Sequence, residues 1–204
     1  MDTQAVERFA GPGATDQARA TAGALAYIGD RLGLWAALAG SGPVTSGELA
    51  EVTGLHERYL HEWLATQTAA EYLTYDPATG RFTLPAEHAA GLADDSSPAA
   101  LAGGFESLAA FWAVADRIAD SFRSGRGVAW QEQDSRLFRG VDRFFAPLYE
   151  RSLTTEWLPA LHSTTVATLE RGGRVMDVGS GFGTSTISTT LERPSLETTL
   201  ASLE

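Results

Sequence analysis

Three glycines separated by single residues follow a short apolar segment near the end of the sequence. Residues 174–178 read Arg-Val-Met-Asp-Val, the composition of a buried β-strand, and residues 179–183 read Gly-Ser-Gly-Phe-Gly. Glycine lets the backbone turn sharply and lets a ligand approach its N–H groups closely. If a helix begins at Thr184, the positive end of its dipole lies beside the same N–H groups. The pattern therefore predicts a loop that holds a cofactor.

The spacing of these glycines separates two classes of cofactor. A dinucleotide-binding loop of the form GxGxxG would need glycine or alanine at position 184, where this sequence has Thr184. The third glycine is Gly183 instead, so the pattern is GxGxG. A tight strand-to-helix turn that binds nothing has the same pattern and remains an open alternative, as does a nicotinamide or flavin dinucleotide site.

An acid, Asp177, stands two residues before the first glycine. Together with the strand and the GxGxG loop, it resembles the first motif of class I S-adenosylmethionine-dependent methyltransferases. Residues 33–38 and 156–161 also resemble bacterial members of this class that carry an N-terminal winged helix and a helical dimerisation half. The resemblance covers residues 15–187 and implies a methyltransferase that uses S-adenosylmethionine.

The resemblance also implies roles for the loop. It places the methionine part of the cofactor against Asp177 and the loop backbone. The cofactor-binding residues that it implies are Asp177, Gly179, Ser180, Gly181 and Gly183. The methyl acceptor implied is a small molecule whose nucleophile attacks the sulfonium methyl in line, with much of the acceleration coming from positioning. The family also implies a homodimer formed through the N-terminal helical domain.

No catalytic residue can be assigned from the sequence. The histidines are His56, His61, His88 and His162, and none stands in a recognisable motif. Each is expected to be a surface or core residue rather than a general base. No metal site is predicted.

The composition excludes several other enzyme classes. There is no cysteine, and all 15 basic residues other than histidine are arginines. Disulfides, thiolate metal sites, Walker A loops and pyridoxal Schiff bases are therefore excluded. The net charge of −11 argues against a nucleic-acid partner. No apolar run approaches the roughly 20 residues that span a bilayer, and the acidic N-terminus is not a secretory signal, so we expect a cytoplasmic protein.

The N-terminal part has the pattern of a winged helix. Thr15 is expected to cap a first helix with apolar positions at Leu25, Ile28, Leu32 and Trp35. Residues 45–48 form a capping box, and the helix that they start is expected to stop at Gly54. The buried face expected for the next helix carries Tyr59, Leu60, Trp63 and Leu64. Two β-prone runs, 72–75 and 81–84, flank a turn and complete the pattern.

Winged helices often bind DNA, but the charges here do not suit that use. Residues 41–90 contain seven acids and two arginines, Arg58 and Arg81. Such a surface repels a phosphate backbone, so dimerisation or packing on the substrate side is favoured.

Residues 91–170 are expected to be a helical connector. An apolar stripe, typical of core more often than of a ligand site, runs along its first part at Phe105, Leu108, Phe111, Trp112, Ala115 and Ile118. A second helical stretch runs from Phe138 to Tyr149, and a short helix is expected to end at Gly172. The predicted domains are thus 1–90, 91–170 and 171–204.

The residues after the loop depart from the family. Only 21 follow Gly183, whereas a class I domain needs well over roughly 100 more. Ten of the 21 are Ser or Thr, which are poor helix formers, and Glu197 follows Pro194 in a segment without a strand pattern. We expect a chain shortened by truncation or by a frameshift near Ser188, or a naturally short one. Loose order over 174–204, weak or no cofactor binding, and no methyltransferase activity of the shortened chain by itself should follow.

The expected fold is mainly α with a small winged-helix β-hairpin, followed by the start of a Rossmann-like α/β methyltransferase domain. The principal alternative to a methyltransferase is a non-catalytic winged-helix regulator or dimerisation module.

Overall fold

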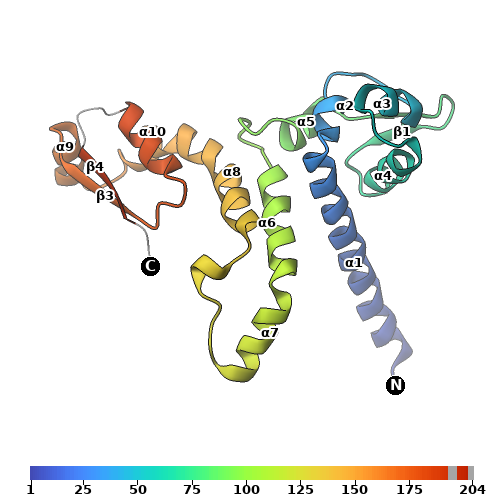
Figure 1. Ribbon diagram of the computed structural model, residues 1–204, viewed down its shortest axis with the longest axis horizontal. Helices are drawn as coiled ribbons and strands as arrows, with labels where there is room; N and C mark the ends of the chain where they lie inside the picture. Colours follow the sequence, from blue (N-terminus) through green and yellow to red (C-terminus); the bar gives the residue numbers. More distant parts are fainter. Residues whose placement is uncertain (193–196, 202–204) are drawn as a thin grey trace. The chain divides into compact units, whose positions relative to one another are not determined.

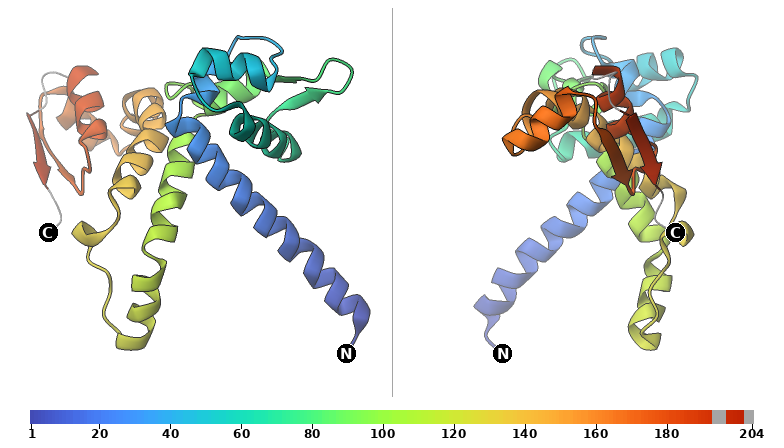
Figure 2. Two further views of the ribbon diagram at one scale, coloured as in Figure 1. Left: turned by 45° about the vertical axis from the view of Figure 1, so that its right-hand side comes forward. Right: turned by 90° about the vertical axis from the view of Figure 1, so that its left-hand side faces the viewer.

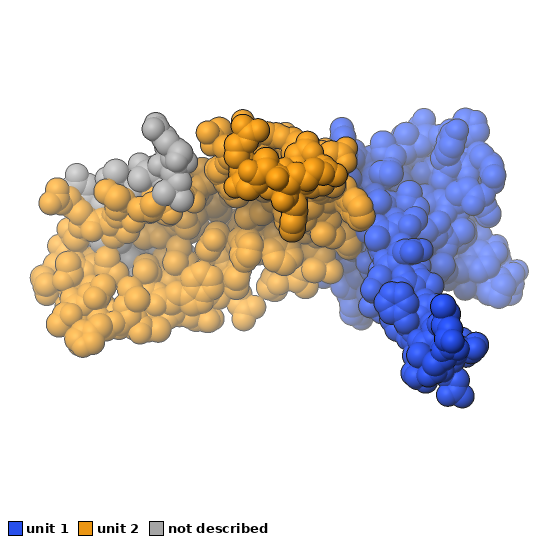
Figure 3. All heavy atoms as spheres, turned by 90° about the horizontal axis from the view of Figure 1, so that it is seen from below, with its two compact units in different colours: residues 1–94 blue, residues 95–204 orange. Residues whose placement is uncertain are grey.

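A computed structural model describes residues 1–192 and 197–201, with side chains to residue 191, and it is 66% helical (Figure 1). The chain divides into two compact units, residues 1–94 and 95–204 (Figure 3). The first holds a winged helix with its small hairpin, and the second holds helices followed by a parallel strand pair. The expected fold class is confirmed.

The first unit opens with α1 (Thr3–Arg31), which begins well before the expected start. Asp2 caps this helix, because its side chain accepts a hydrogen bond from the backbone N–H of Ala5 at 3.2 Å. Thr15 lies inside the helix, and its hydroxyl donates to the carbonyl of Gly11. The prediction that Thr15 caps the helix is therefore wrong, since propensity alone did not reveal the earlier cap.

The first helix also ends earlier than its apolar spacing suggests. Leu32 is the C-cap of α1, and Gly33 follows in the left-handed region at φ 69°. Trp35 therefore belongs to a separate short helix, α2 (Leu34–Leu38), and does not continue the face that carries Ile28.

The rest of the unit has the winged-helix order. Its elements are α3 (Ser46–Thr53), α4 (Glu57–Ala69), β1 (Thr74–Asp76), β2 (Arg81–Thr83) and α5 (Ala86–Leu92). The predicted capping box of Thr45 and Glu48 is confirmed, as is the helix stop at Gly54, which has φ 69°. Strands β1 and β2 pair antiparallel, and Val44 adds a bridge to Phe82.

Two tryptophans form the centre of this unit. The rings of Trp35 and Trp63 lie 4.7 Å apart, and both side chains are buried. Their indole N–H groups donate to the α1 carbonyls of Ala26 at 3.0 Å and Leu25 at 2.8 Å. This satisfies both buried donors and fixes α2 and α4 against α1. Tyr59 was expected on the buried face of α4, but its side chain is 77% exposed.

The second unit begins with a run of helices. They are α6 (Ala102–Ala113), α7 (Ala115–Ser124), a 3₁₀ turn η1 (Trp130–Glu132), α8 (Ser135–Ser152), a π-turn η2 (Leu153–Trp157) and α9 (Ser163–Glu170). The apolar stripe on α6 and α7 was expected to be core. Instead, Phe111 is 51% exposed, Trp112 is 73% exposed and Ile118 is 39% exposed. Helices α6 and α8 approach each other most closely at two glycines, Gly103 and Gly140.

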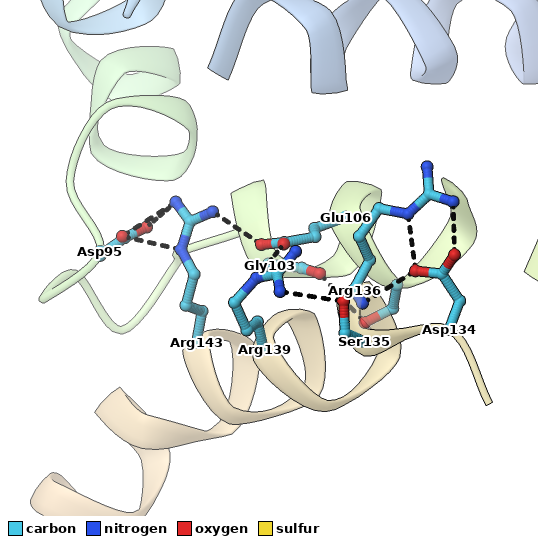
Figure 4. Close-up of polar contacts among 9 residues, drawn as sticks. Asp95, Gly103, Glu106, Asp134, Ser135, Arg136, Arg139 and Arg143 are labelled. Atoms are coloured by element: carbon cyan, nitrogen blue, oxygen red, sulfur yellow. Dashed lines mark hydrogen bonds and ion pairs between the residues drawn. The ribbon is translucent and has the colours of Figure 1, made fainter. Parts of the chain in front are cut away.

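The crossing of α6 and α8 is close. A Cβ added to Gly103 would lie 2.5 Å from the carbonyl oxygen of Gly140, so glycine is required on both helices. Beside the crossing, the carboxylate of Glu106 is almost fully buried and accepts from Arg139 at 3.0 Å and Arg143 at 3.2 Å. Arg143 also binds Asp95 through two nitrogens (Figure 4). These contacts compensate the buried charge.

A parallel strand pair follows these helices. Strand β3 (Arg174–Val178) pairs with β4 (Glu197–Ala201), with Arg174 opposite Glu197, and α10 (Thr184–Glu192) lies between them in the chain (Figure 2). The segment at Glu197 was thus wrongly expected to lack a strand, and the Ser/Thr-rich segment forms a helix. Alternate residues of β3 are exposed, so its faces are less covered than a buried strand requires. Pro194 lies outside the described residues.

The helix crossing gives a first prediction. Gly140→Ala places a methyl group 2.5 Å from Ser107 Oγ, and overpacking of this kind lowers the free energy of unfolding by about 1–3 kcal/mol. The upper part of this range exceeds the stabilisation of about 1 kcal/mol that replacing glycine by alanine gives inside a helix. Thermal unfolding followed by circular dichroism should show a lower melting temperature. Gly127→Ala is the control, because nothing lies within 4 Å of a Cβ at that position; equal melting temperatures for the two variants would contradict the close crossing.

A second prediction concerns the wing. Arg81 donates to Glu48 through two nitrogens at 2.7 and 2.8 Å, and with the Thr45 backbone it holds the pKa of Glu48 at about 2, below the ordinary 4.5. A lowered pKa stabilises the fold above pH 4.5, and this stabilisation is lost as the pH falls from 4.5 towards 2. Urea unfolding should show Glu48→Gln less stable than the wild type at pH 6, with the gap narrowing at pH 3. A gap independent of pH would argue against this ion pair.

Candidate functional site

The glycine loop joins β3 to α10 in the predicted order of strand, turn and helix. Gly179, Gly181 and Gly183 have φ of 75°, 57° and 83°, all in the left-handed region. Other residues rarely adopt this conformation, so the glycines are required by the backbone itself. The N–H of Gly183 donates to the carbonyl of Ser180 at 2.8 Å, which closes the turn directly before α10.

The middle of the loop is open on the side where a side chain would stand. A Cβ built on Gly181 meets no atom within 4 Å. The neighbouring Phe182 is 58% exposed. The loop therefore presents exposed backbone at Gly179 and Gly181 beside the positive end of a nine-residue helix, whereas Gly183 is buried. This is the geometry that a cofactor cradle requires.

Asp177 is bound to the first turn of α10. One oxygen of its carboxylate, Oδ2, accepts from the hydroxyl of Ser185 at 2.5 Å and from that of Thr186 at 2.7 Å. Strand and helix are therefore tied across the loop by charge-assisted hydrogen bonds. The motif acid thus has a local structural contact, and its predicted contact with the cofactor stays a prediction.

A second carboxylate, absent from the sequence prediction, also reaches this helix. Asp142 of α8 accepts from the hydroxyl of Thr184 at 2.5 Å. Thr184 directly follows the last glycine, so two acids lie beside the start of α10. The sequence signal for this pair is weak, because its members are 42 positions apart and Asp142 stands in no recognisable motif.

A hollow of about 610 Å³ lies beside β3. Its polar lining includes Asp177, Ser185 and Thr186, and its apolar lining includes Tyr149 and Leu153. The glycines of the loop do not line it, so the hollow and the loop are neighbouring surfaces that share Asp177.

The histidines take structural positions. His56 caps α4 and His162 caps α9, each accepting from a backbone N–H two residues later. His88 Nδ1 lies 2.9 Å from the carbonyl of Tyr72, and His61 packs edge-on against Phe82. Over the part of the chain that the structure describes, no group of three or more acids and histidines is arranged to hold a metal ion. Within the same part, no helix has both the length and the apolar character needed to span a membrane.

Comparison with known proteins agrees with this architecture. Residues 20–94 match the model of the Rv2258c-like winged HTH domain. No curated protein matches the chain. The winged helix inferred from the capping box and hairpin is thus confirmed independently.

Solved methyltransferase structures share the fold of nearly the whole chain. Mitomycin 7-O-methyltransferase superposes with a TM-score of 0.69 at 22% identity, covering 97% of this chain and 59% of its own. An O-methyltransferase family protein from Burkholderia thailandensis superposes with a TM-score of 0.62 at 16% identity. The match covers 98% of this chain and 57% of that protein. Human N-acetylserotonin methyltransferase, in complex with SAM, superposes with a TM-score of 0.62 at 16% identity. The match covers 98% of this chain and 59% of that protein.

At these identities the likeness defines the fold. The chain has the fold of S-adenosylmethionine-dependent O-methyltransferases: a winged-helix unit, then helices, then a strand, glycine loop and helix. It spans less than 60% of the length of these structures.

Proposed function

We propose that this chain is a small-molecule methyltransferase and that its glycine loop binds S-adenosylmethionine. The observation that carries the proposal is the loop itself, with three left-handed glycines between a strand that bears Asp177 and the start of α10. When bound, the cofactor supplies a methyl group on a positively charged sulfur. The predicted contacts are Asp177, Gly179, Ser180, Gly181 and Gly183.

The charges around the loop favour this cofactor over a dinucleotide. Asp142 and Asp177 both place carboxylates at the start of α10. S-adenosylmethionine carries a positive sulfonium and a positive ammonium group, which these acids attract. A dinucleotide carries a negative pyrophosphate, which they repel. The two acids and the absence of glycine at position 184 therefore both favour S-adenosylmethionine over a dinucleotide.

The residues of the chain would bind and orient the cofactor. The loop backbone would face the methionine part of the cofactor, and the bonds from Ser185 and Thr186 to Asp177 would keep the loop in place. A nucleophile on the acceptor would then meet the methyl group in line, so that positioning provides much of the acceleration.

Isothermal titration calorimetry tests the cofactor assignment. Because β3, the glycine loop and α10 are formed in the structure, we expect weak binding and not its absence. S-adenosylmethionine and S-adenosylhomocysteine should bind with dissociation constants of roughly 1 mM or a little below, and NAD should not bind. Gly181→Ala should weaken binding by roughly 5- to 30-fold, since alanine at φ 57° strains the loop by roughly 1–2 kcal/mol.

Gly125→Ala is the matched control. Gly125 also has a positive φ, of 70°, but it ends α7, away from the loop in the sequence. It should lower stability to a similar extent and leave cofactor binding unchanged. Binding of NAD in place of S-adenosylmethionine, or of neither at 10 mM ligand, which is well above about 1 mM, would refute the assignment.

A second candidate, a dimerisation module, is favoured by the first unit. Apart from Gly13, every residue of 1–21 is exposed. This half of α1 also contains Pro12, which costs a helix about 3 kcal/mol, so packing against another chain would stabilise it. An apolar hollow of about 500 Å³ lies between α1 and α4 and is lined by Ile28, Leu55 and Tyr59. We propose that this unit associates with a second copy of the chain.

The same unit is poorly suited to DNA. Both arginines of residues 41–90 are engaged with acids, Arg58 with Glu62 and Arg81 with Glu48. Sedimentation equilibrium should show a dimer for the wild type and a weaker one for Ile28→Glu. Arg58→Glu is the exposed control, and a monomeric wild type or tight retention on duplex DNA at physiological salt would contradict this use.

A further inference from the structure

Three consecutive hydroxyl groups follow the last glycine of the loop, and each donates to a carboxylate. Thr184 donates to Asp142 at 2.5 Å, while Ser185 and Thr186 donate to Asp177 at 2.5 and 2.7 Å. The two acids come from different elements, α8 and β3. The start of α10 is therefore held from two sides.

The hydroxyls further along α10 behave differently. Ser188, Thr189 and Thr190 each donate to the backbone carbonyl four residues earlier, as Ser and Thr commonly do inside helices. Thr184, Ser185 and Thr186 begin the helix, so the residues four positions earlier lie in the loop, and their hydroxyls bond to other elements instead. Bonds from a hydroxyl to a carboxylate are among the shorter and stronger hydrogen bonds.

Asp142 stands on a helix that is itself firmly placed. Arg139 and Arg143 on α8 bind the buried Glu106 of α6, and Gly140 lies at the close crossing of the two helices. Asp142 is one residue from Arg143, so its side chain leaves the helix about 100° away, towards α10. The α6–α8 contact thus fixes the point from which Asp142 holds Thr184.

We propose that Asp142 is a positioning residue of the cofactor site, acting through Thr184 to hold residues 179–183 in their left-handed conformation before any ligand binds. The proposal rests on the cofactor role of the loop for its functional meaning. Glycines lose more conformational freedom on ordering than any other residue. A loop ordered in advance spares the ligand that loss, so affinity rises without any contact between Asp142 and the cofactor.

Hydrogen–deuterium exchange of the whole chain without ligand tests the structural step. In peptides covering residues 179–188, Asp142→Ala and Thr184→Val should each raise the exchange rate roughly 10-fold, as expected for loss of one hydrogen bond to a charged group. The double variant should exchange no faster than either single variant, because both remove the same bond.

Matched variants separate this bond from general damage to α10. Thr184→Ser keeps the hydroxyl and should restore wild-type exchange. Ser188→Ala removes a hydroxyl that bonds only within the helix, and it should leave exchange unchanged. Asp142→Asn keeps an acceptor oxygen without the charge and should fall between the wild type and Asp142→Ala. It also provides a second variant if alanine at 142 disrupts the fold.

The same variants link the bond to binding. Asp142→Ala and Thr184→Val should each weaken S-adenosylhomocysteine binding by roughly 10-fold, and Thr184→Ser should not. Unchanged loop exchange in Asp142→Ala and Thr184→Val, or fully additive effects in the double variant, would overturn the proposal. Failure of the wild type to bind would overturn the cofactor assignment instead, and the ligand-free exchange would still decide the role of Asp142.

Discussion

The second unit depends on the close approach of two helix backbones. Gly103 and Gly140 let α6 and α8 cross at a distance that leaves no room for a Cβ, and the buried Glu106 is compensated there by Arg139 and Arg143. Buried charges require such partners, so the crossing has one favourable register. The position of α8, and of every side chain that it presents to the glycine loop, follows from this contact.

Local signals in the sequence predicted local structure well. The capping box at Thr45, the stop at Gly54 and the strand-to-helix turn at residues 179–183 each depend on neighbours within a few positions, and all three are found. The prediction that Thr15 caps the first helix was wrong, because Asp2 provides an earlier cap and the Gly-Pro-Gly segment between them is helical. Propensity could not choose between these two starts.

Contacts between residues far apart in the sequence could not be predicted from local signals. Nothing in the sequence links Asp142 to Thr184, and the glycines at the α6–α8 crossing look like any others until the helices are placed. The aromatic stripe that includes Trp112 was expected to be core because large apolar residues are usually buried. Most of it is exposed, and α6 meets α8 at Gly103 instead. Ser and Thr after the loop suggested a weak helix, yet three of their hydroxyls are the ones that bind the two acids.

The loop and its acids together define the ligand that suits them. Accessible backbone at the start of a helix accommodates many cofactors, but carboxylates on both sides select for one that carries positive charge. In the winged-helix unit, Arg58 and Arg81 are engaged with acids and an apolar hollow lies along α1, and these two features support the proposed contact with protein over one with nucleic acid.

The most direct measurement is an NMR titration of the ¹⁵N-labelled chain with S-adenosylhomocysteine. We expect the amide signals of Gly179, Gly181 and Gly183 to shift progressively and more than any signal of residues 1–94, and we expect NAD to leave them in place. Shifts confined to residues 1–94, or equal shifts with NAD, would contradict the claim that this loop is an S-adenosylmethionine site.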